Sequence, residues 1–401
     1  MVQARDFKGS ILRVAFTMIG NVSWTAGANY LENLLSVIAE NSELNITPIL
    51  FVGEDVDPII LERFIKYLSV PPVYTKVFND DKLMIYARLF CSYILQRDFF
   101  VENEFKQYAI DVVFQHGNWY GCYFRINTLA WIPDFQHKHL PKMFSWIKVQ
   151  LRNIDCIFLS KWSTRILVSS EDAKNDCEYY FPKSKGRISV MPFSVKAPEF
   201  IARDSLHDVV NIYNLPKRFY YLPNQLWAHK NHIGILQGLK VLVASGSDVV
   251  IVATGNPVDN RNPKYPKMIL EFILDNNLQN NFIFLGLIPH HHVFHLMRNA
   301  VAVINPSFFE GWSTSVEEAK SLGIPLLLSD IRVHKEQAGE MASYFNPNDP
   351  IDIASSLNAV WSKQDVPNIK ERELAALSRY ELSRKKFVKR FHSIITGMTS
   401  V

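Results

Sequence analysis

Cysteine is scarce in this sequence of 401 residues, and no two of its four cysteines are spaced as C-x-x-C. That spacing is typical of metal sites and redox motifs, so its absence argues against both. We expect all four to be reduced thiols, most of them buried, as in proteins of a cytosolic compartment. They are Cys91, Cys122, Cys156 and Cys177.

Long hydrophobic runs are also missing. No stretch approaches the roughly 20 apolar residues that a membrane-spanning helix needs. The apolar run from Ile11 to Ile19 is short and contains Arg13 and Thr17, which argues against a secretory signal peptide. We therefore expect a cytoplasmic protein. These features do not exclude peripheral contact with the face of a membrane.

Neither sign of charge dominates, and the glycine pattern of dinucleotide sites is absent. The formal net charge of +4 gives no case for binding nucleic acid. The turn GNVSWTAGANY after the first apolar run contains Gly20 and Gly27 but no G-x-G-x-x-G. An NAD-dependent oxidoreductase is therefore disfavoured.

What the sequence does contain is an alternation of short apolar runs with longer amphipathic segments, which predicts a parallel sheet covered by helices. With 48% hydrophobic and 20% charged residues, the composition is that of a globular chain with a large core. In the first half we predict a helix at 27–40 and strands at 11–19, 47–53, 111–117, 155–160 and 187–193.

The pattern restarts after residues 194–217, which hold two prolines, lack periodicity and are interpreted as an interdomain connection. The fold class is therefore α/β, with Rossmann-like domains at 1–200 and 201–379 and a charged helix, about 380–401, that packs back on the first domain. In the second half we predict strands at 219–224, 248–255, 281–288, 300–307 and 324–330, and helices at 231–244, 264–277, 290–299 and 314–322.

Residues 300–330, AVAVINPSFFEGWSTSVEEAKSLGIPLLLSD, predict a strand, a loop, a helix and a second strand. Thr314 followed by Glu317 reads as a capping box, so we expect the helix to begin near Thr314 and to end at Gly323. The backbone amides at such a helix start attract anions. Those amides belong to Gly311, Ser313, Thr314 and Ser315.

Two glutamates bracket this helix start, Glu310 in the loop and Glu318 inside the helix, with seven residues between them. A diphosphate bound at the amides would have one carboxylate beside it and another one turn deeper. Carboxylates suit sugar hydroxyls, because each accepts two hydrogen bonds. A solvated helix face is the alternative reading of such glutamates, but the strand-to-helix turn favours a site.

This segment resembles the E-x7-E motif of the retaining glycosyltransferases of family 4, which have the GT-B fold. The resemblance extends to 131–144, 223–236 and 281–289, so it covers most of the chain. It implies two Rossmann-like domains that face each other across a cleft, with the donor held by the second and the acceptor entering from the first. It also implies that Glu310 faces the donor sugar and that Glu318 binds the ribose.

A leaving diphosphate needs positive charge as the glycosidic bond breaks. Lys230, in the segment NQLWAHKNH, is the candidate, with help from His229. A lysine at a helix start is poorly placed as a mere surface charge. Family members commonly carry an arginine at the start of this loop, and here Asn224 or Gln225 holds its place, which leaves Lys230 as the main phosphate partner.

The first domain offers further candidates by resemblance. Gly27 matches a glycine-rich loop that approaches the diphosphate and the acceptor, although an ordinary loop glycine is the alternative. Family members often carry a His-Asp pair after the strand that ends near residue 131. Here Pro133 takes the His place and Asp134 the Asp place, while His137 replaces the imidazole or only caps the next turn. His116 is a further candidate of this kind.

No metal ion is expected in the site. Residues 290–292 and His295 are histidines, but consecutive histidines on a helix point in different directions and no carboxylate is near in sequence. The resemblance implies no required metal, in keeping with the lack of a D-x-D motif on the donor side. The candidate pair, Asp55 and Asp57, lies in the first domain.

The resemblance therefore implies transfer of a hexose or related sugar from a nucleoside diphosphate sugar, of UDP or GDP type, without a further cofactor. The acceptor is expected to be a saccharide or a lipid-linked molecule, in polysaccharide or glycan synthesis. The alternatives are another GT-B enzyme, such as a sugar-nucleotide epimerase or a phosphorylase, and a non-catalytic sugar-nucleotide-binding module. The presence of Glu310, Glu318 and Lys230 argues against the non-catalytic module.

Overall fold

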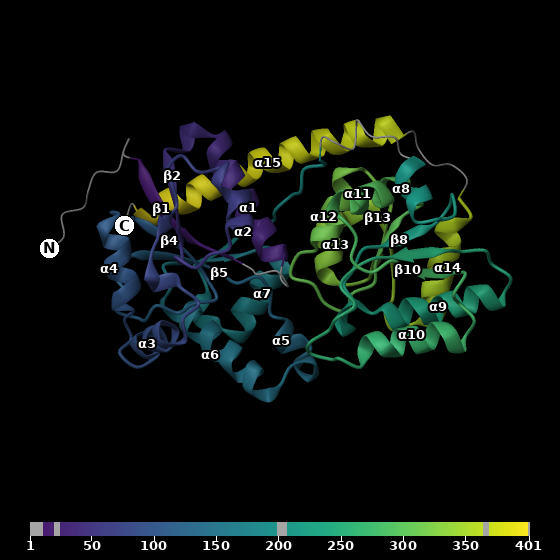
Figure 1. The fold of residues 1–401 in the computed structure, drawn as a ribbon, viewed down its shortest axis with the longest axis horizontal. Coiled ribbons are helices and arrows are strands. Elements are labelled where there is room, and N and C mark those ends of the chain that lie inside the picture. Colours follow the sequence, from purple (N-terminus) through teal and green to yellow (C-terminus); the bar gives the residue numbers. More distant parts are fainter. Residues whose placement is uncertain (1–10, 20–24, 199–206, 364–368, 400–401) are drawn as a thin grey trace. The chain divides into compact units, whose positions relative to one another are not determined.

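The computed structural model describes residues 11–19, 25–198, 207–363 and 369–399, so Gly20 and part of the predicted interdomain connection lie outside the described residues. The chain forms two compact units (Figure 1). Unit 1 consists of residues 1–135, 150–193 and 384–401, and unit 2 of residues 136–149 and 194–383. Each unit is built on its own parallel sheet, which confirms the expected α/β class with two parallel-sheet domains.

Unit 1 contains a seven-stranded sheet of order β3-β2-β1-β4-β5-β6-β7, in which every described pair is parallel. Ala15 and Phe51 pack on one face of it, whereas Phe16 and Phe114 stack on the other, so both faces are buried. The strands are β1 (Leu12–Thr17), β2 (Ile46–Val52), β3 (Val73–Tyr74), β4 (Val112–His116), β5 (Asn127–Trp131), β6 (Arg165–Val168) and β7 (Ile188–Val190).

Aspartate or serine side chains begin several helices of this half by accepting a backbone N–H, as Asp81 does for α3 and Asp98 for α4. The helices of the first half of the chain are α1 (Thr25–Glu40), α2 (Pro58–Ile65), α3 (Lys82–Tyr93), α4 (Phe99–Gln107), α5 (Gln136–His139), α6 (Trp146–Trp162) and α7 (Glu171–Tyr180). Of these, α5 and the first turn of α6 belong to unit 2. All four cysteines are free, and three of them are buried.

One predicted strand is wrong. Residues 155–160 lie inside α6, and the strand of this region is β6, which begins at Arg165. A short apolar run does not distinguish a buried strand from the buried side of a helix. Here Cys156 and Leu159, three residues apart, are buried while Ile157 is exposed, which is the helical pattern.

Unit 2 contains a six-stranded parallel sheet of order β10-β9-β8-β11-β12-β13. Successive residues of β8 enter different cores, Tyr220 on one face and Tyr221 on the other, because strand side chains alternate. The strands are β8 (Tyr220–Leu222), β9 (Ile251–Ala253), β10 (Phe282–Phe284), β11 (Val303–Asn305), β12 (Leu326–Ser329) and β13 (Ala342–Phe345). The helices are α8 (His207–Ile212), α9 (His232–Ala244), α10 (Tyr265–Asp275), α11 (His290–Asn299), α12 (Thr314–Ser321), α13 (Arg332–Ala338), α14 (Pro350–Trp361) and α15 (Ile369–Thr399).

The last helix, α15, has 31 residues and contributes to both units. From Arg384 onward it belongs to unit 1, where Arg384 forms an ion pair with Glu40 of α1 and the carbonyl of Met398 accepts from Asn127. Its buried side chains there are Phe387, Val388, Phe391, Ile394, Ile395 and Met398. Among the described residues, no helix is both long enough and apolar enough to span a membrane.

Candidate functional site

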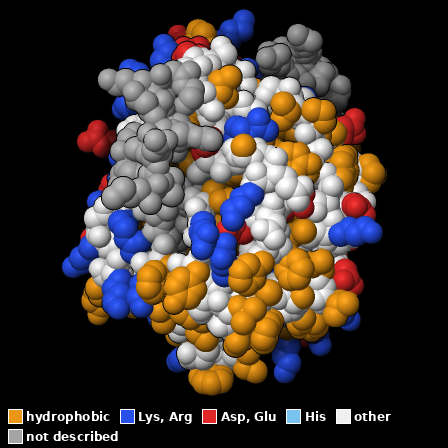
Figure 2. Space-filling model, turned by 90° about the vertical axis from the view of Figure 1, so that its left-hand side faces the viewer, with side chains coloured by type: hydrophobic (Ala, Val, Ile, Leu, Met, Phe, Trp, Pro, Cys, Tyr) orange, Lys and Arg blue, Asp and Glu red, His pale blue; other side chains and the backbone are white. Residues whose placement is uncertain are grey.

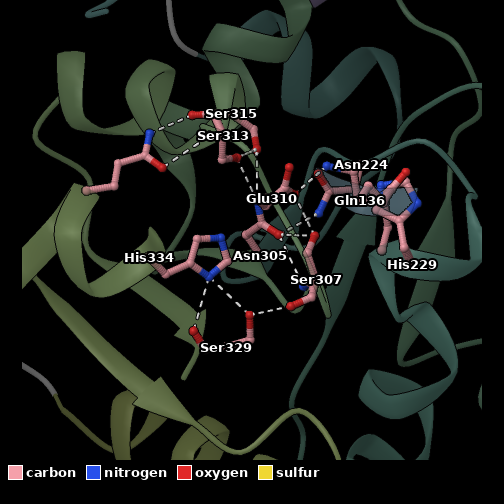
Figure 3. A network of polar contacts seen from close by, with 12 residues as sticks. Gln136, Asn224, His229, Asn305, Ser307, Glu310, Ser313, Ser315, Ser329 and His334 are labelled. Atoms are coloured by element: carbon pink, nitrogen blue, oxygen red, sulfur yellow. Dashed lines mark hydrogen bonds and ion pairs between the residues drawn. The ribbon is translucent and has the colours of Figure 1, made fainter. Parts of the chain in front are cut away.

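The candidate site of unit 2 is built on loops that leave the carboxyl ends of β8, β9, β11 and β12. Parallel strands end at one edge of the sheet, so these loops meet there, the usual place for ligands in open α/β sheets. The network of polar contacts in Figure 3 includes residues from the ends of β11 and β12, such as Asn305 and Ser329, and from the loop after β8, such as His229.

The helix α12 begins at Thr314, as predicted, but the capping box is wrong. Ser313 is the N-cap residue, and its side chain makes no capping hydrogen bond. Glu317 is turned inward instead and is 3% exposed. Its Oε1 accepts from Lys320 Nζ at 2.7 Å and from Gln337 Nε2 at 2.9 Å, so it anchors α12 to α13.

Gln337 also holds the start of α12 through Ser313. The Ser313 amide donates to Gln337 Oε1 at 3.2 Å, and Gln337 Nε2 donates to the Ser313 carbonyl at 2.7 Å. The amide of Ser313 therefore has a partner within the protein, and its part in anion binding stays a prediction. Anion binding by the backbone amides of Gly311, Thr314 and Ser315 also stays a prediction.

Glu310 and Lys230, separated by 80 positions in sequence, form an ion pair with Oε1 and Nζ 2.5 Å apart. Both side chains are largely buried, at 10% and 14% exposure. Burial alone would raise the pKa of Glu310, but the ammonium of Lys230 holds the pKa below its usual range. A fixed carboxylate and a fixed ammonium therefore lie together at the sheet edge.

Glu318 lies in α12 and is 8% exposed. Its Oε1 is 3.4 Å from Nε2 of His290, the first residue of α11. Two other histidines of α11 have different surroundings. Nδ1 of His292 is hydrogen-bonded to the hydroxyl of Tyr213 at 2.8 Å, and His295 is buried. Over the described ranges, no group of three or more His, Cys, Asp or Glu residues could hold a metal ion.

Arg261, in the loop after β9, was not predicted as a site residue. Its guanidinium donates to Gln136 Oε1 at 2.9 Å and to His229 Nδ1 at 3.2 Å. The guanidinium carbon lies over the rings of Trp227 and Phe144, at 5.0 and 5.4 Å from their centroids. The guanidinium is therefore held in one orientation against the histidine.

His229 is neutral in this setting. Burial lowers its pKa well below the usual value, Lys230 and Arg261 lower it further, and Glu310 opposes them. Because Nδ1 accepts from Arg261, the single proton of the neutral ring is on Nε2. His229 therefore offers a hydrogen-bond donor next to the Lys230–Glu310 pair without adding charge.

A buried polar network that no sequence pattern predicted supports Glu310 (Figure 3). Ser307 Oγ is 2.7 Å from Oε1 of Glu310 and 2.7 Å from Oδ1 of Asn305. Ser329 Oγ donates to the Ser307 carbonyl at 2.6 Å and lies 3.0 Å from Nδ1 of His334. The one available signal was a polar residue at the end of each apolar strand, Asn305 in β11 and Ser329 in β12.

Asn224 and Gln225 hold the place of the arginine expected by resemblance. Asn224 is bonded inside the protein, through its Nδ2, to Oδ1 of Asn305 at 3.4 Å. Oε1 of Gln225 is buried, and no hydrogen-bond partner for it is found in the part of the chain that the structure describes. The amide of Gln225 is therefore the better placed of the two for an additional ligand.

The other predicted residues belong to four different parts of the chain. Gly27 is buried and lies inside the first turn of α1, not before the helix. Asp134 belongs to unit 1 and forms an ion pair with Arg152 at 2.9 Å, whereas His137 belongs to α5 of unit 2 and is 1% exposed. His116 ends β4, and burial lowers its pKa to about 4.

Comparison with known proteins shows which family the chain resembles. Residues 203–375 match the family model described as glycosyl transferases group 1. Over these residues, which are less than half of the chain, the protein is similar to the group 1 glycosyltransferases. The matched residues include Lys230, Glu310 and Glu318, and the resemblance to glycosyltransferases of this group is thereby confirmed.

Two curated relatives are similar to part of this chain. The O-antigen chain mannosyltransferase RfbU of Salmonella typhimurium is 25% identical over 234 residues, which are 57% of this chain and 60% of RfbU. The UDP-Gal:alpha-D-GlcNAc-diphosphoundecaprenol alpha-1,3-galactosyltransferase of Escherichia coli is 24% identical over 246 residues, 56% of this chain and 59% of that protein. This chain therefore matches about three fifths of each relative's length.

Solved structures share the fold along nearly the whole chain. A glycosyltransferase from Rickettsia africae aligns with a TM-score of 0.69 at 14% identity, over 96% of this chain and 98% of its own. HepE of Anabaena, in complex with UDP and glucose, aligns with a TM-score of 0.66 at 13% identity, over 97% and 100%. These likenesses confirm the GT-B type of fold.

Proposed function

We propose that this protein is a retaining glycosyltransferase that moves a hexose or related sugar from a UDP-sugar to a lipid-linked saccharide in polysaccharide synthesis. The observation that supports it most is the buried Lys230–Glu310 pair at the sheet edge, with Glu318 in the helix that follows. The name of the Escherichia coli relative gives UDP-Gal as its donor and a diphosphoundecaprenol-linked GlcNAc as its acceptor.

In this proposal the donor lies along the start of α12. Glu318 accepts hydrogen bonds from the ribose, and the diphosphate lies at the positive end of the helix beside Lys230. Negative charge grows on the diphosphate as the glycosidic bond breaks, so a fixed ammonium lowers the energy of the transition state. Glu310 accepts from hydroxyls of the transferred sugar, and Nε2–H of His229 is a further donor at the same edge.

Thermal unfolding with a panel of UDP-, GDP-, ADP- and dTDP-sugars tests the donor class, because a ligand that binds the folded state stabilises it by mass action. We expect the UDP-sugars to raise the melting temperature and the Glu318→Gln variant to lose that shift. A panel in which no nucleotide sugar stabilises the protein would contradict the proposal.

Product analysis then separates transfer from the other activities of this fold. Transfer releases UDP and lengthens a saccharide, whereas an epimerase converts the sugar nucleotide and a phosphorylase consumes phosphate. The absence of a required metal stays a prediction, and transfer that survives EDTA is the expected result.

A further inference from the structure

Arg261 is a cation enclosed within the candidate site, and the proposed function gives it no role. Figure 2 shows many lysine and arginine side chains on the surface of one face of the molecule, where water and salt screen their charges. The side chain of Arg261 is only 23% exposed, and its guanidinium lies over the rings of Trp227 and Phe144. A charge largely removed from water acts on its neighbours more strongly than a surface charge does.

The loop after β9, which carries Arg261, is fixed to the loop after β8 at two points. Asp259, which is 2% exposed, accepts from the amide of Ala228 at 3.1 Å through Oδ2 and from the amide of Arg261 at 2.9 Å through Oδ1. The loops also touch at Gly255, where a Cβ atom would lie 2.5 Å from the carbonyl oxygen of Asn224. Arg261 is therefore held at a set position relative to the residues that follow β8.

The hydrogen bond from Arg261 determines which nitrogen of His229 carries the proton. Gln136 and His229 lie side by side in Figure 3, because one guanidinium donates to both. An arginine only donates, so Nδ1 of His229 must accept and Nε2 of the neutral ring carries the proton. Within the described ranges, no residue is hydrogen-bonded to Nε2, so this N–H is left to donate to an oxygen of a ligand.

His229 is also tied to the loop that carries Glu310. The carbonyl of His229 accepts from the amide of Phe308 at 2.9 Å, and Lys230, the next residue, forms the ion pair with Glu310. His229 and Lys230 therefore reach the same edge of the sheet from one loop. In the proposed function, the ligand that needs donors there is the diphosphate of the sugar nucleotide.

We propose that Arg261 is a positioning residue: it holds Nδ1 of His229 as an acceptor and so commits Nε2–H to donate to an oxygen of the leaving diphosphate. This role rests on the proposed function. When the bond between the sugar and the diphosphate oxygen breaks, its electron pair passes to that oxygen, and the hydrogen bond from His229 strengthens with the growing charge. The proton stays on Nε2, so His229 is unchanged after each turnover.

Kinetics of Arg261→Met test this role, because methionine fills part of the same space and donates no hydrogen bond. The ring of His229 in this variant is no longer prevented from carrying its proton on Nδ1. We expect kcat to fall by at least about tenfold, as for the loss of a donor to a developing oxyanion. The KM for the donor should change by less than about threefold, because the lost hydrogen bond is stronger in the transition state than in the bound donor.

A double variant shows whether Arg261 acts through His229. If it does, Arg261→Met combined with His229→Gln has about the same kcat as His229→Gln alone, since no imidazole is left to position. Two losses that multiply would show that Arg261 acts independently of His229, for example by supporting the loop alone.

The matched control is Arg218→Met. Arg218 also lies over an aromatic ring, that of Trp361 at 4.5 Å, and donates to the carbonyl of the same residue. It precedes β8 and is therefore at the other end of that strand from His229. Its variant should keep the wild-type kcat.

Nitrogen-15 NMR of the imidazole groups reports the proton directly, and His229→Gln identifies the signals of His229 among those of the twelve histidines. We expect the wild type to carry the proton on Nε2 and Arg261→Met to show the Nδ1-protonated form as well. UDP should shift the Nε2–H signal of the wild type, whereas uridine, which lacks the diphosphate, should not. The wild-type measurements decide the matter even if Arg261→Met does not fold.

The proposal is overturned if Arg261→Met keeps the wild-type kcat, if its loss multiplies with that of His229→Gln, or if UDP leaves the Nε2–H signal in place. A wild type with its proton on Nδ1 would also overturn it. UDP affinity, measured by calorimetry on the same samples, reports the donor site separately. A wild type that does not bind UDP would contradict the proposed function, whereas a UDP-binding enzyme with an unshifted His229 signal would contradict this inference alone.

Discussion

At the scale of single residues, the ion pair of Lys230 with Glu310 determines the charge state of the site. Lys230 keeps the buried carboxylate of Glu310 ionised, because it lowers the pKa that burial alone would raise. The two groups therefore depend on each other, and removal of either changes the chemistry of the one that remains.

We expect Lys230→Ala to lower kcat more than it raises the KM for the donor. The ammonium acts on charge that develops as the diphosphate leaves, so the transition state loses more than the bound donor does. The pKa of Glu310 should rise in the variant. As the pH is lowered, the residual activity should therefore begin to decline at a higher pH than the activity of the wild type does. Steady-state kinetics across pH measures both effects, and wild-type turnover at saturating donor would show that Lys230 is not the phosphate partner.

We expect Glu318→Gln to weaken UDP binding by on the order of 1 to 3 kcal/mol, the scale for hydrogen bonds to a charged group. Isothermal titration calorimetry with UDP measures this. Glu271→Gln, which changes a half-exposed glutamate of α10, is the control and should bind UDP normally. Equal affinities of the Glu318 variant and the wild type would place the ribose elsewhere.

The two glutamates and Lys230 could be predicted because each belongs to a short motif with its own local pattern. Arg261, Asn305 and His334 could not, since their roles arise only where loops from different strands meet. The capping box shows the same limit, because the sequence placed the helix start at Thr314 correctly but could not reveal that tertiary contacts turn Glu317 inward.

At the scale of secondary structure elements, α9 and α14 pack closely because Gly238 has no side chain. A Cβ atom at this position would lie 2.5 Å from Cγ2 of Ile353 and 3.2 Å from the backbone nitrogen of Ala354. The glycine therefore fixes how near the two helices approach, although it lowers the intrinsic stability of α9.

We expect Gly238→Ala to destabilise the protein by about 1 to 2 kcal/mol, because the clash outweighs the gain in helix propensity. Gly397→Ala in α15 is the matched control, since a Cβ there meets nothing within 4 Å. It should stabilise the protein by about 0.5 to 1 kcal/mol. Urea unfolding measures both, and a stabilised Gly238→Ala protein would mean that α14 can move aside at little cost.

Helices with strong periodicity were predicted well, and α11 begins and ends at the predicted residues. The strand predicted at residues 155–160 was wrong because six residues are too few to distinguish the period of a helix from that of a strand. The assignment of residues 136–149 to unit 2 is a matter of tertiary contacts, such as that of Gln136 with Arg261, and no pattern along the chain carries that information.

At the scale of the whole molecule, buried histidines make the fold sensitive to acid. Burial lowers the pKa of His116 and of His334 to about 4 and that of His232 to about 3. In the unfolded chain these side chains titrate near the ordinary value of about 6.5. As the pH falls below that value, the unfolded state takes up protons before the folded state does, so stability is lost.

We therefore expect the free energy of unfolding to change little near pH 7 and to fall between about pH 6.5 and 3. Each histidine contributes about 1.4 kcal/mol per unit of pKa difference. His334→Asn, whose amide approximates the Nδ1 position that bonds Ser329, should reduce the slope over that range. Urea unfolding at several pH values gives the slope, and an unchanged slope would contradict the assignment.

The division of α15 between two units has a consequence for biosynthesis. A ribosome that has made residues 1–193 has made nearly all of unit 1, yet the helix residues that cover part of its core are translated only after unit 2. Until then, the surface of unit 1 that receives Phe391, Ile395 and Met398 is uncovered. Unit 1 therefore completes its folding after unit 2 has been translated, and the nascent chain exposes an apolar surface that chaperones recognise.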